Sequence, residues 1–360
     1  MKYHMENNHK KINKTRISGA ILGIALVVFL IGCVYLDRIS VMQTLEDGTE
    51  VAYAEAGTDA VFTLEGRIEC IEDRTDVQFV AAILVPKSWN ARQNATATYT
   101  TNIHSDPDEE LPMSIIPDSS IPSNGGGRTW SEALMQEYGV GPNVLNDMEW
   151  VVLQTNLKWL ILNGDKATYT IKIRCNVGEL NLKARIGFFV NHTDDGFGSG
   201  GDEKKMAFSD ECFEVINGKG SVIDFCTNHF NRVQPLAALQ NDFVSFSFMG
   251  DVDDNALALI DEVYFEATAY TKNGNVLTVF ERSAKTLMKR EAPDSKVFDI
   301  TIWPRSYFGV AQNDEIERIE YVFTDKNGIE TITQSDDDYI VFGTEIGENK
   351  KPFSFEFKCD

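Results

Sequence analysis

The chain has 360 residues and carries 33 Lys and Arg against 55 Asp and Glu, a formal net charge of −22. This length provides for two domains with cores of their own. A surface this acidic repels phosphate backbones, which excludes nucleic acid as a partner. Six cysteines are too few to staple domains of this size, so we expect most of them to be buried thiols.

The first 36 residues predict a membrane-targeting signal or anchor. Five Lys and Arg precede residues 17–36, which read ISGAILGIALVVFLIGCVYL and carry no charge. A basic run followed by an apolar run directs the rest of the chain out of the cytoplasm. Two interpretations stay open. The stretch is long enough for an uncleaved spanning helix, and Leu30-Ile31-Gly32-Cys33 resembles the lipobox of bacterial lipoproteins, which implies a lipidated Cys33.

Residues 37–57 are predicted to be a polar tether, followed by a first β-domain over residues 58–220. Alternating or continuous apolar runs predict strands at 60–71, 76–85, 149–155, 158–162, 167–175 and 179–190. Four prolines and Gly125-Gly126-Gly127 make residues 102–128 a loop. One helix is predicted to begin after Thr129, because Glu132 three positions later completes a capping box.

Residues 221–240 are predicted to connect this domain to a second β-domain over residues 241–360. There Phe243, Ser245 and Ser247 are expected on one face of a strand, and further strands are expected up to 338–343 and 353–357. Asn273-Gly274 and Asn327-Gly328 are typical of hairpin turns. Short turns and a single helix predict an all-β chain of two antiparallel immunoglobulin-like β-sandwiches. Crossover helices are missing, which excludes a parallel α/β fold.

No pattern in the sequence indicates catalysis, a metal site or a cofactor. The histidines lack metal-ligand spacing, and no glycine-rich loop opens a helix. Asp251, Asp253 and Asn255 have the spacing of a calcium loop, but Ala256 occupies the position where the sharp turn requires Gly. An acidic loop between strands is therefore the favoured interpretation. Carboxylate pairs for glycoside hydrolysis depend on distance in space, so an enzyme stays open as a third hypothesis.

Exposed aromatic rings are the side chains that glycan-binding sheets use, because sugar rings stack their apolar faces on them. Trp89 stands beside Asn90 in a turn after Pro86. Trp303, Tyr307 and Phe308 cluster in the segment WPRSYFGV, which Pro304 and Gly309 mark as non-strand. These four residues are our candidates for carbohydrate binding.

Longer motifs resemble known families. LVPKSWNARQNATATYT (84–100), TWSEALMQEYGVGPNVLNDMEWVV (129–152) and ECFEVINGKGSVIDFC (211–226) look like a family of Bacteroidetes cell-envelope lipoproteins whose domain is of unknown function. ITIWPRSYFGVAQNDEIERIEYVFTDKNG (300–328) resembles the β-sandwich modules of starch-processing enzymes and starch-binding surface lipoproteins. The first resemblance implies a gene beside TonB-dependent glycan importers in a polysaccharide-utilisation locus. It supplies no catalytic residues.

The favoured hypothesis is a non-catalytic outer-membrane lipoprotein, exposed at the cell surface, that binds glycan or presents it to a TonB-dependent importer complex. The alternative is a structural accessory subunit or adhesin that docks on protein partners. Glycan retardation in affinity electrophoresis separates the two.

Overall fold

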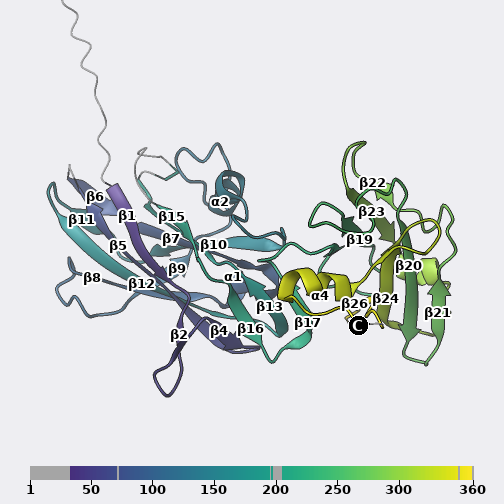
Figure 1. The fold of residues 1–360 in the computed structure, drawn as a ribbon. Coiled ribbons are helices and arrows are strands. Elements are labelled where there is room, and N and C mark those ends of the chain that lie inside the picture. The colour runs from purple at the N-terminus through teal and green to yellow at the C-terminus, as the bar shows by residue number, and fades with distance from the viewer. Residues whose placement is uncertain (1–32, 71–72, 195, 198–204, 348, 359–360) are drawn as a thin grey trace, which may run out of the picture.

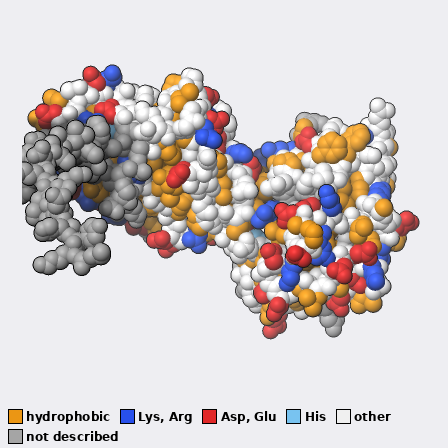
Figure 2. All heavy atoms as spheres, turned by 90° about the horizontal axis from the view of Figure 1, so that it is seen from above, with side chains coloured by type: hydrophobic (Ala, Val, Ile, Leu, Met, Phe, Trp, Pro, Cys, Tyr) orange, Lys and Arg blue, Asp and Glu red, His pale blue; other side chains and the backbone are white. Residues whose placement is uncertain are grey.

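The computed structural model describes residues 33–70, 73–194, 196–197, 205–347 and 349–358, and strands are the main regular structure among them. They form two bodies joined by a narrow waist, visible in the ribbon and in the space-filling view (Figures 1 and 2). Most of the predicted membrane segment, residues 17–32, lies outside the described residues. Within them, no helix combines the length and the apolar composition that crossing a bilayer requires.

The first body is built on a nine-stranded antiparallel sheet. In spatial order its strands are β1 (Cys33–Ser40), β5 (Asp59–Glu69), β12 (Lys166–Asn176), β8 (Thr96–Thr101), β9 (Leu111–Ile115), β10 (Met148–Thr155), β7 (Phe79–Pro86), β14 (Gly187–His192) and β15 (Met206–Phe208). Three smaller sheets complete it: β17 (Lys219–Asp224), β13 (Leu180–Ala184), β16 (Phe213–Ile216) and β4 (Tyr53–Glu55); β11 (Trp159–Ile161) with β6 (Arg74–Val77); and β2 (Gln43–Thr44) with β3 (Glu50–Val51).

The core of this body lies between the nine-stranded sheet and the sheet that contains β16. Inward and outward residues alternate along β5, as its period-two pattern predicts. Phe62 of β5 meets Phe213 of β16 edge-on, with ring centroids 5.1 Å apart. The large sheet also curls: β1, the strand at one edge, contacts β14, which lies next to the strand at the opposite edge. The sheet of β17, β13, β16 and β4 includes parallel pairs and is not purely antiparallel.

Strand β1 is the main departure from the expected organisation. Residues 37–57 are not a tether: they contribute β1 to β4, and β1 pairs with β5 from Cys33 opposite Glu69 to Ser40 opposite Thr63. Val34 and Leu36 are almost fully buried in the core. The apolar Val34–Leu36 flank therefore belongs to the folded body, because alternate apolar side chains of an edge strand cover the open side of a curled sheet.

Helices are short in the first body. They are the 3-10 turn η1 (Lys87–Trp89), α1 (Ala91–Asn94) and α2 (Trp130–Tyr138). The predicted capping box of α2 is confirmed: the Glu132 backbone N–H donates to Thr129 Oγ1 at 3.3 Å, and the Thr129 N–H donates to Glu132 Oε2 at 2.9 Å. These two bonds satisfy backbone donors that a helix otherwise leaves unpaired.

The second body is a sandwich of two antiparallel sheets. The four-stranded sheet contains β18 (Asn231–Gln234), β19 (Val244–Met249), β23 (Val297–Ile302) and β22 (Lys289–Arg290). The five-stranded sheet contains β21 (Val276–Val279), β20 (Tyr264–Thr271), β24 (Ile316–Thr324), β25 (Thr331–Ile332) and β26 (Phe353–Glu356). Its two helices are α3 (Pro304–Phe308) and α4 (Gln334–Phe342). Phenylalanine rings fill the space between the sheets, for example Phe246 and Phe265 at 4.8 Å.

Two further expectations were wrong and one is confirmed. Residues 338–343 form the end of α4 rather than a strand, because Thr333 and Asp336 make a second capping box. The predicted connector 221–240 contains the end of β17 and all of β18, so the link between bodies is only residues 225–230. The hairpins at Gly274 and Gly328 form as expected, with φ values of +80° and +68°.

A charged histidine joins the two bodies at this link. The Nε2 atom of His229 lies 3.1 Å from Asp224 Oδ2 of β17, and its Nδ1 atom lies 2.5 Å from Asp337 Oδ2 of α4. Both carboxylates are buried, and Lys183 Nζ lies 3.0 Å from the same oxygen of Asp224. Asp337 also accepts the Phe230 backbone N–H at 2.6 Å. The histidine therefore bridges one acid from each body.

The charges at the bridge set each other's protonation. Burial alone lowers the pKa of His229, but Asp224 and Asp337 outweigh it and raise that pKa to about 9. Burial alone raises the pKa of Asp224, but His229, the Cys226 N–H and Lys183 lower it to about 2. At neutral pH the bridge is therefore an imidazolium between two carboxylates.

A disulfide between Cys212 and Cys226 holds the link against the first body. The bridge spans 14 residues, a loop for which chain entropy predicts about 3 kcal/mol of stabilisation. Cys175 is a buried free thiol, and burial raises its pKa to about 12.

Reduction of this disulfide is expected to lower the free energy of unfolding by about 3 kcal/mol, because the unfolded chain regains the conformational entropy that the closed loop had removed. Urea unfolding with and without reductant measures the change. The double variant Cys212→Ala, Cys226→Ala serves as the control, since reductant leaves its midpoint unchanged. Equal midpoints of the native chain under both conditions contradict the prediction.

Candidate functional site

Three of the four predicted stacking residues are buried. Trp89 packs in the core of the first body, stacked on Phe62 with ring centroids 5.9 Å apart and edge-on to Phe213 at 5.9 Å. The turn after Pro86 places the indole inward rather than toward solvent, because η1 and α1 close over the end of β7. Trp89 therefore cannot stack on a glycan in this fold.

Tyr307 and Phe308 lie on α3 and point into the second body. Tyr307 packs against Phe265 with ring centroids 6.2 Å apart, and Lys285 Nζ donates to the Tyr307 carbonyl oxygen at 2.5 Å. A helix of five residues has one apolar face, and here both rings belong to it. The sequence marked the segment correctly as non-strand, but only packing decided that these rings are core.

Trp303 is the exception, with 46% of its surface exposed. All five tryptophans of the chain are among the described residues, and Trp303 alone is exposed. It follows the last residue of β23, where Ile302 pairs with Val244 of β19. Phe243, which is 68% exposed, directly precedes β19, so continuing the register by one residue brings it to the same end of the sheet as Trp303.

Polar side chains continue from this aromatic pair along the same side of the four-stranded sheet. Ser245 pairs with Thr301, and their hydroxyls are 2.7 Å apart. The next outward row joins Ser247 to Asp299. Buried residues such as Phe246 and Ile300 alternate with them, so these outward positions face away from the core. We define the outer face as Phe243, Ser245, Ser247, Asp299, Thr301 and Trp303.

The outer face combines two kinds of group that sugar recognition uses. Trp303 and Phe243 offer apolar ring surface, while the serine, threonine and aspartate side chains offer hydrogen-bond donors and acceptors. Paired strands hold the four polar side chains in place, and each ring directly adjoins one of these strands, which limits the ordering entropy lost on binding. Sequence alternation alone indicated that Phe243, Ser245 and Ser247 share a face. Pairing with β23 required the tertiary structure.

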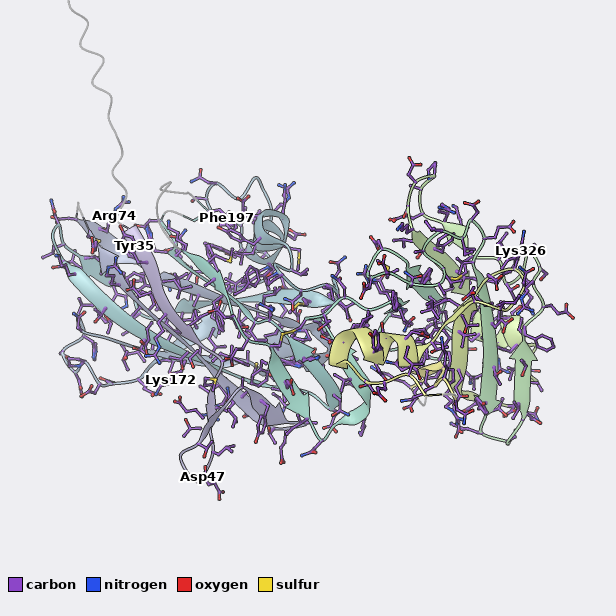
Figure 3. All side chains as sticks on the ribbon, viewed as in Figure 1. Tyr35, Asp47, Arg74, Lys172, Phe197 and Lys326 are labelled. Atoms are coloured by element: carbon purple, nitrogen blue, oxygen red, sulfur yellow. A yellow bond between two sulfur atoms is a disulfide. The ribbon has the colours of Figure 1, made fainter. Side chains whose placement is uncertain are left out.

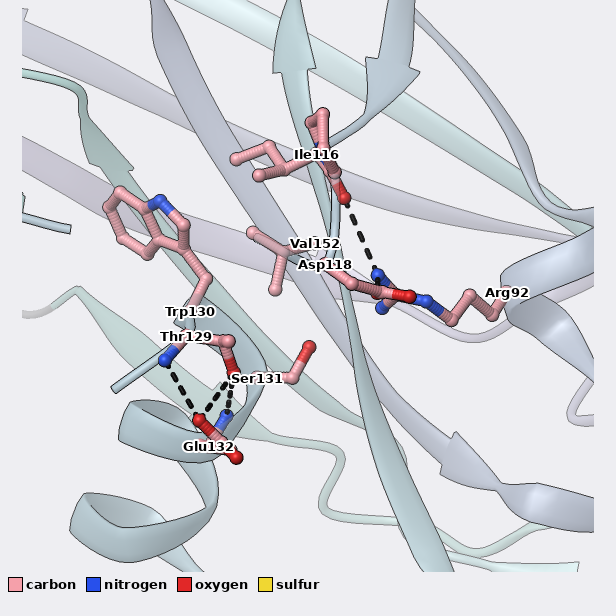
Figure 4. A pocket seen from close by; sticks show the side chains of 9 residues that line it. Arg92, Ile116, Asp118, Thr129, Trp130, Ser131, Glu132 and Val152 are labelled. Atoms are coloured by element: carbon pink, nitrogen blue, oxygen red, sulfur yellow. Dashed lines mark hydrogen bonds and ion pairs between the residues drawn. The ribbon is translucent and has the colours of Figure 1, made fainter. Parts of the chain in front are cut away.

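The first body has a hollow of about 260 Å³ beside the start of α2. Figure 4 shows Thr129 bonded to Glu132, and Arg92 bonded to the Ile116 carbonyl oxygen. Arg92 forms an ion pair with Asp118 and donates to the Ile116 carbonyl at 3.5 Å, and Thr129 and Glu132 form the capping box. Backbone and hydroxyl donors of Thr129 lower the pKa of Glu132. These groups stabilise loop and helix ends, so we place the candidate site on the outer face instead.

Cys33, the predicted lipidation site, is the first described residue and opens β1. In the described part of the chain, no three His, Cys, Asp or Glu side chains gather as a metal site would require. In the acidic loop whose spacing resembles a calcium loop, residues 251–255, the Asn255 side chain instead donates to the backbone: Nδ2 bonds to the carbonyls of Gly250 and Asp253 at 3.1 and 2.8 Å.

Comparisons with solved structures find only distant similarity. The C-terminal domain of the Streptococcus pyogenes antigen I/II-family protein AspA is 9% identical, with a TM-score of 0.24 over 91% of this chain and 98% of that chain. The major pilin SpaA of Corynebacterium diphtheriae is 8% identical, with a TM-score of 0.25 over 89% and 64%. AvmM, which catalyses macrocyclization in alchivemycin A biosynthesis, is 9% identical, with a TM-score of 0.25 over 50% and 97%. TM-scores this low carry no argument about function.

Sequence families are more informative. No curated protein matches the chain. A family model described as a domain of unknown function (DUF8578) matches residues 231–332, which include the outer face. A second, described as a domain of unknown function (DUF4961), matches residues 42–229. Because this second match covers more than half of the 360 residues, the chain belongs to the DUF4961 family.

Proposed function

We propose that the protein is a non-catalytic lipoprotein of the bacterial outer membrane that holds glycan on the outer face of its second body. In this role it presents the glycan to a TonB-dependent importer complex. The observation that carries the proposal is the exposure of Trp303 and Phe243 at one end of this face, next to the hydroxyls of Ser245 and Thr301. Such a face stacks on sugar rings and pairs with their hydroxyl groups.

Two features support a location outside the cytoplasm. The basic and apolar residues 1–32, which lead directly to Cys33, are typical of an export signal. The Cys212–Cys226 disulfide is a bond that persists in oxidising compartments and is rare in the cytosol. Both features fit a protein that works in the cell envelope.

Affinity electrophoresis against a panel of polysaccharides tests the proposal. We expect at least one glycan to retard the chain. Trp303→Ala is expected to weaken the affinity for that glycan, measured from the retardation, about tenfold, because the main stacking ring is lost. Tyr339→Ala is the matched control, since Tyr339 is also an exposed aromatic residue but lies on α4. Its retardation is expected to equal that of the native chain.

The same experiment distinguishes the alternative. If every polysaccharide leaves migration unchanged while the chain co-purifies with importer subunits, it is an accessory subunit or adhesin instead. If Trp303→Ala and the native chain bind a glycan equally, the glycan site lies elsewhere. Turnover of a glycan that is lost on replacing one acidic residue contradicts the non-catalytic role.

A further inference from the structure

One end of the first body exposes three leucines close together. Leu157, Leu160 and Leu162 are 43%, 59% and 46% exposed. Leu160 lies in β11 and the other two flank that strand. Single exposed leucines are common, but three within six residues make a local apolar surface. We refer to these three residues as the leucine ribbon.

The strand geometry directs Leu160 and Leu162 away from the core. Ile161 of β11 is buried and pairs with Arg74 of β6. Side chains alternate along an extended chain, so Leu160 and Leu162 share the side opposite to Ile161. Leu157 lies in the bend before β11 and adds to the exposed apolar surface there.

The leucine ribbon lies at the end of the body where the chain enters. Cys33 opens β1 opposite Glu69 of β5, and Glu69 is in turn opposite Lys166, the first residue of β12. Two strand spacings, about 10 Å, separate Cys33 from Lys166. Leu162 precedes Lys166 by one turn. Figures 1 and 3 show β1, β6 and β11, with Tyr35 and Arg74, together at this end.

We propose that the leucine ribbon inserts into the surface of the lipid bilayer that anchors the chain, and so sets the first body end-on against the membrane. The apolar residues 17–32 end directly before Cys33, and β1 begins there without an intervening tether. A lipid on Cys33, or an uncleaved membrane helix that ends there, therefore holds this end of the body at the bilayer surface. The inference rests on the anchoring part of the proposed function and is independent of glycan binding.

The charges around the ribbon favour an apolar contact over an electrostatic one. Lys158 and Lys166 are balanced by Asp73 and Asp165, and the nearby loop 106–110 adds four acidic residues. Such a surface has no net attraction for anionic headgroups. Its affinity therefore comes from burying leucine side chains at the boundary between headgroups and acyl chains, and is insensitive to salt.

Site-specific fluorescence in vesicles tests the proposal. The full chain is reconstituted in phosphatidylcholine vesicles, with Leu160→Cys or Leu162→Cys labelled by an environment-sensitive dye. Leu259→Cys is the matched control, because Leu259 is 92% exposed in the second body. We expect several-fold stronger quenching by nitroxide-labelled acyl chains at 160 and 162 than at 259, unchanged by raised salt. The native chain, labelled in parallel, supplies the background, and thermal melts confirm that each variant is folded.

Two results overturn the proposal, and they differ in what else they affect. If the chain floats with the vesicles but dye at positions 160 and 162 is quenched no more than dye at 259, the end-on contact is absent and the anchor stands. If the chain does not float with the vesicles, the anchoring part of the proposed function fails together with this inference.

Discussion

Replacing His229 with Ala is expected to lower the free energy of unfolding by about 3–5 kcal/mol, the largest loss we predict from a single charged residue. The substitution removes the cation between Asp224 and Asp337, whose side chains are each only 4% exposed. Asp224 keeps its contact with Lys183, but Asp337 loses its imidazolium partner, and the two buried acids then face each other across the junction of the two bodies. Urea unfolding followed by circular dichroism measures the loss.

His104→Ala is the matched control for this experiment. The side chain of His104 is 21% exposed, the same as that of His229, but the carboxylate beside it, Glu109 at 3.6 Å, is itself 54% exposed. Its loss is expected to cost less than about 1 kcal/mol. Equal effects of the two substitutions contradict a bridging role for His229.

The pH dependence of stability gives an independent test of the bridge. The folded-state pKa of His229 is raised to about 9, so the folded chain binds more protons than the unfolded chain between about pH 6.5 and pH 9. The stabilisation is therefore complete below about pH 6.5 and is lost as the pH rises through about 9. The pKa of Asp224 is lowered to about 2, so its contribution is present above about pH 4 and is lost as the pH falls toward 2.

Comparing the native chain with His229→Ala isolates this dependence. The urea midpoint of the native chain is expected to fall from pH 6.5 to pH 9 more steeply than that of the variant. Parallel pH profiles of the two proteins contradict a histidine held in its charged form by the two acids.

Replacing Leu36 with Ala is expected to destabilise the first body by about 2–5 kcal/mol, because a buried leucine side chain is lost and a cavity replaces it. Leu36 lies in β1, opposite Gly66 of β5, and is almost fully buried. Were Leu36 part of the anchor and residues 37–57 only a tether, as the sequence predicted, the same change would leave the stability of the body unaltered. Thermal and urea unfolding of the full chain measure the difference.

Leu45→Ala is the control for β1. Leu45 lies in the turn between β2 and β3 and is 39% exposed, so its truncation is expected to change stability by less than about 1 kcal/mol. A loss at Leu36 no larger than that at Leu45 contradicts the assignment of β1 to the core.

If the chain is anchored at the end of residues 17–32, as we propose, the first body has little rotational freedom relative to the membrane. With β1 beginning at Cys33, the folded body starts where the apolar segment ends. The outer face belongs to the second body, beyond the narrow link of residues 225–230. The His229 bridge and the disulfide join the residues around this link, and so help to hold the second body against the first.

Local patterns in the sequence were enough to determine the all-β class, the capping box at Thr129, and the hairpins at Gly274 and Gly328. Each depends on residues close together in the chain, so period-two alternation, caps and positive-φ glycines are visible without the fold. The same alternation indicated that Phe243, Ser245 and Ser247 point one way.

Burial and pairing over long sequence distances were decided only by the tertiary structure. Nothing in the sequence near Trp89 or Tyr307 distinguishes an exposed ring from a core ring, because that depends on which strands pack above it. The bridge from Asp224 through His229 to Asp337 joins residues more than a hundred positions apart. Likewise β1 forms a strand because β5 supplies its hydrogen-bond partners and the core that it covers. The sequence around Val34–Leu36 does not contain β5, so it could not reveal this pairing.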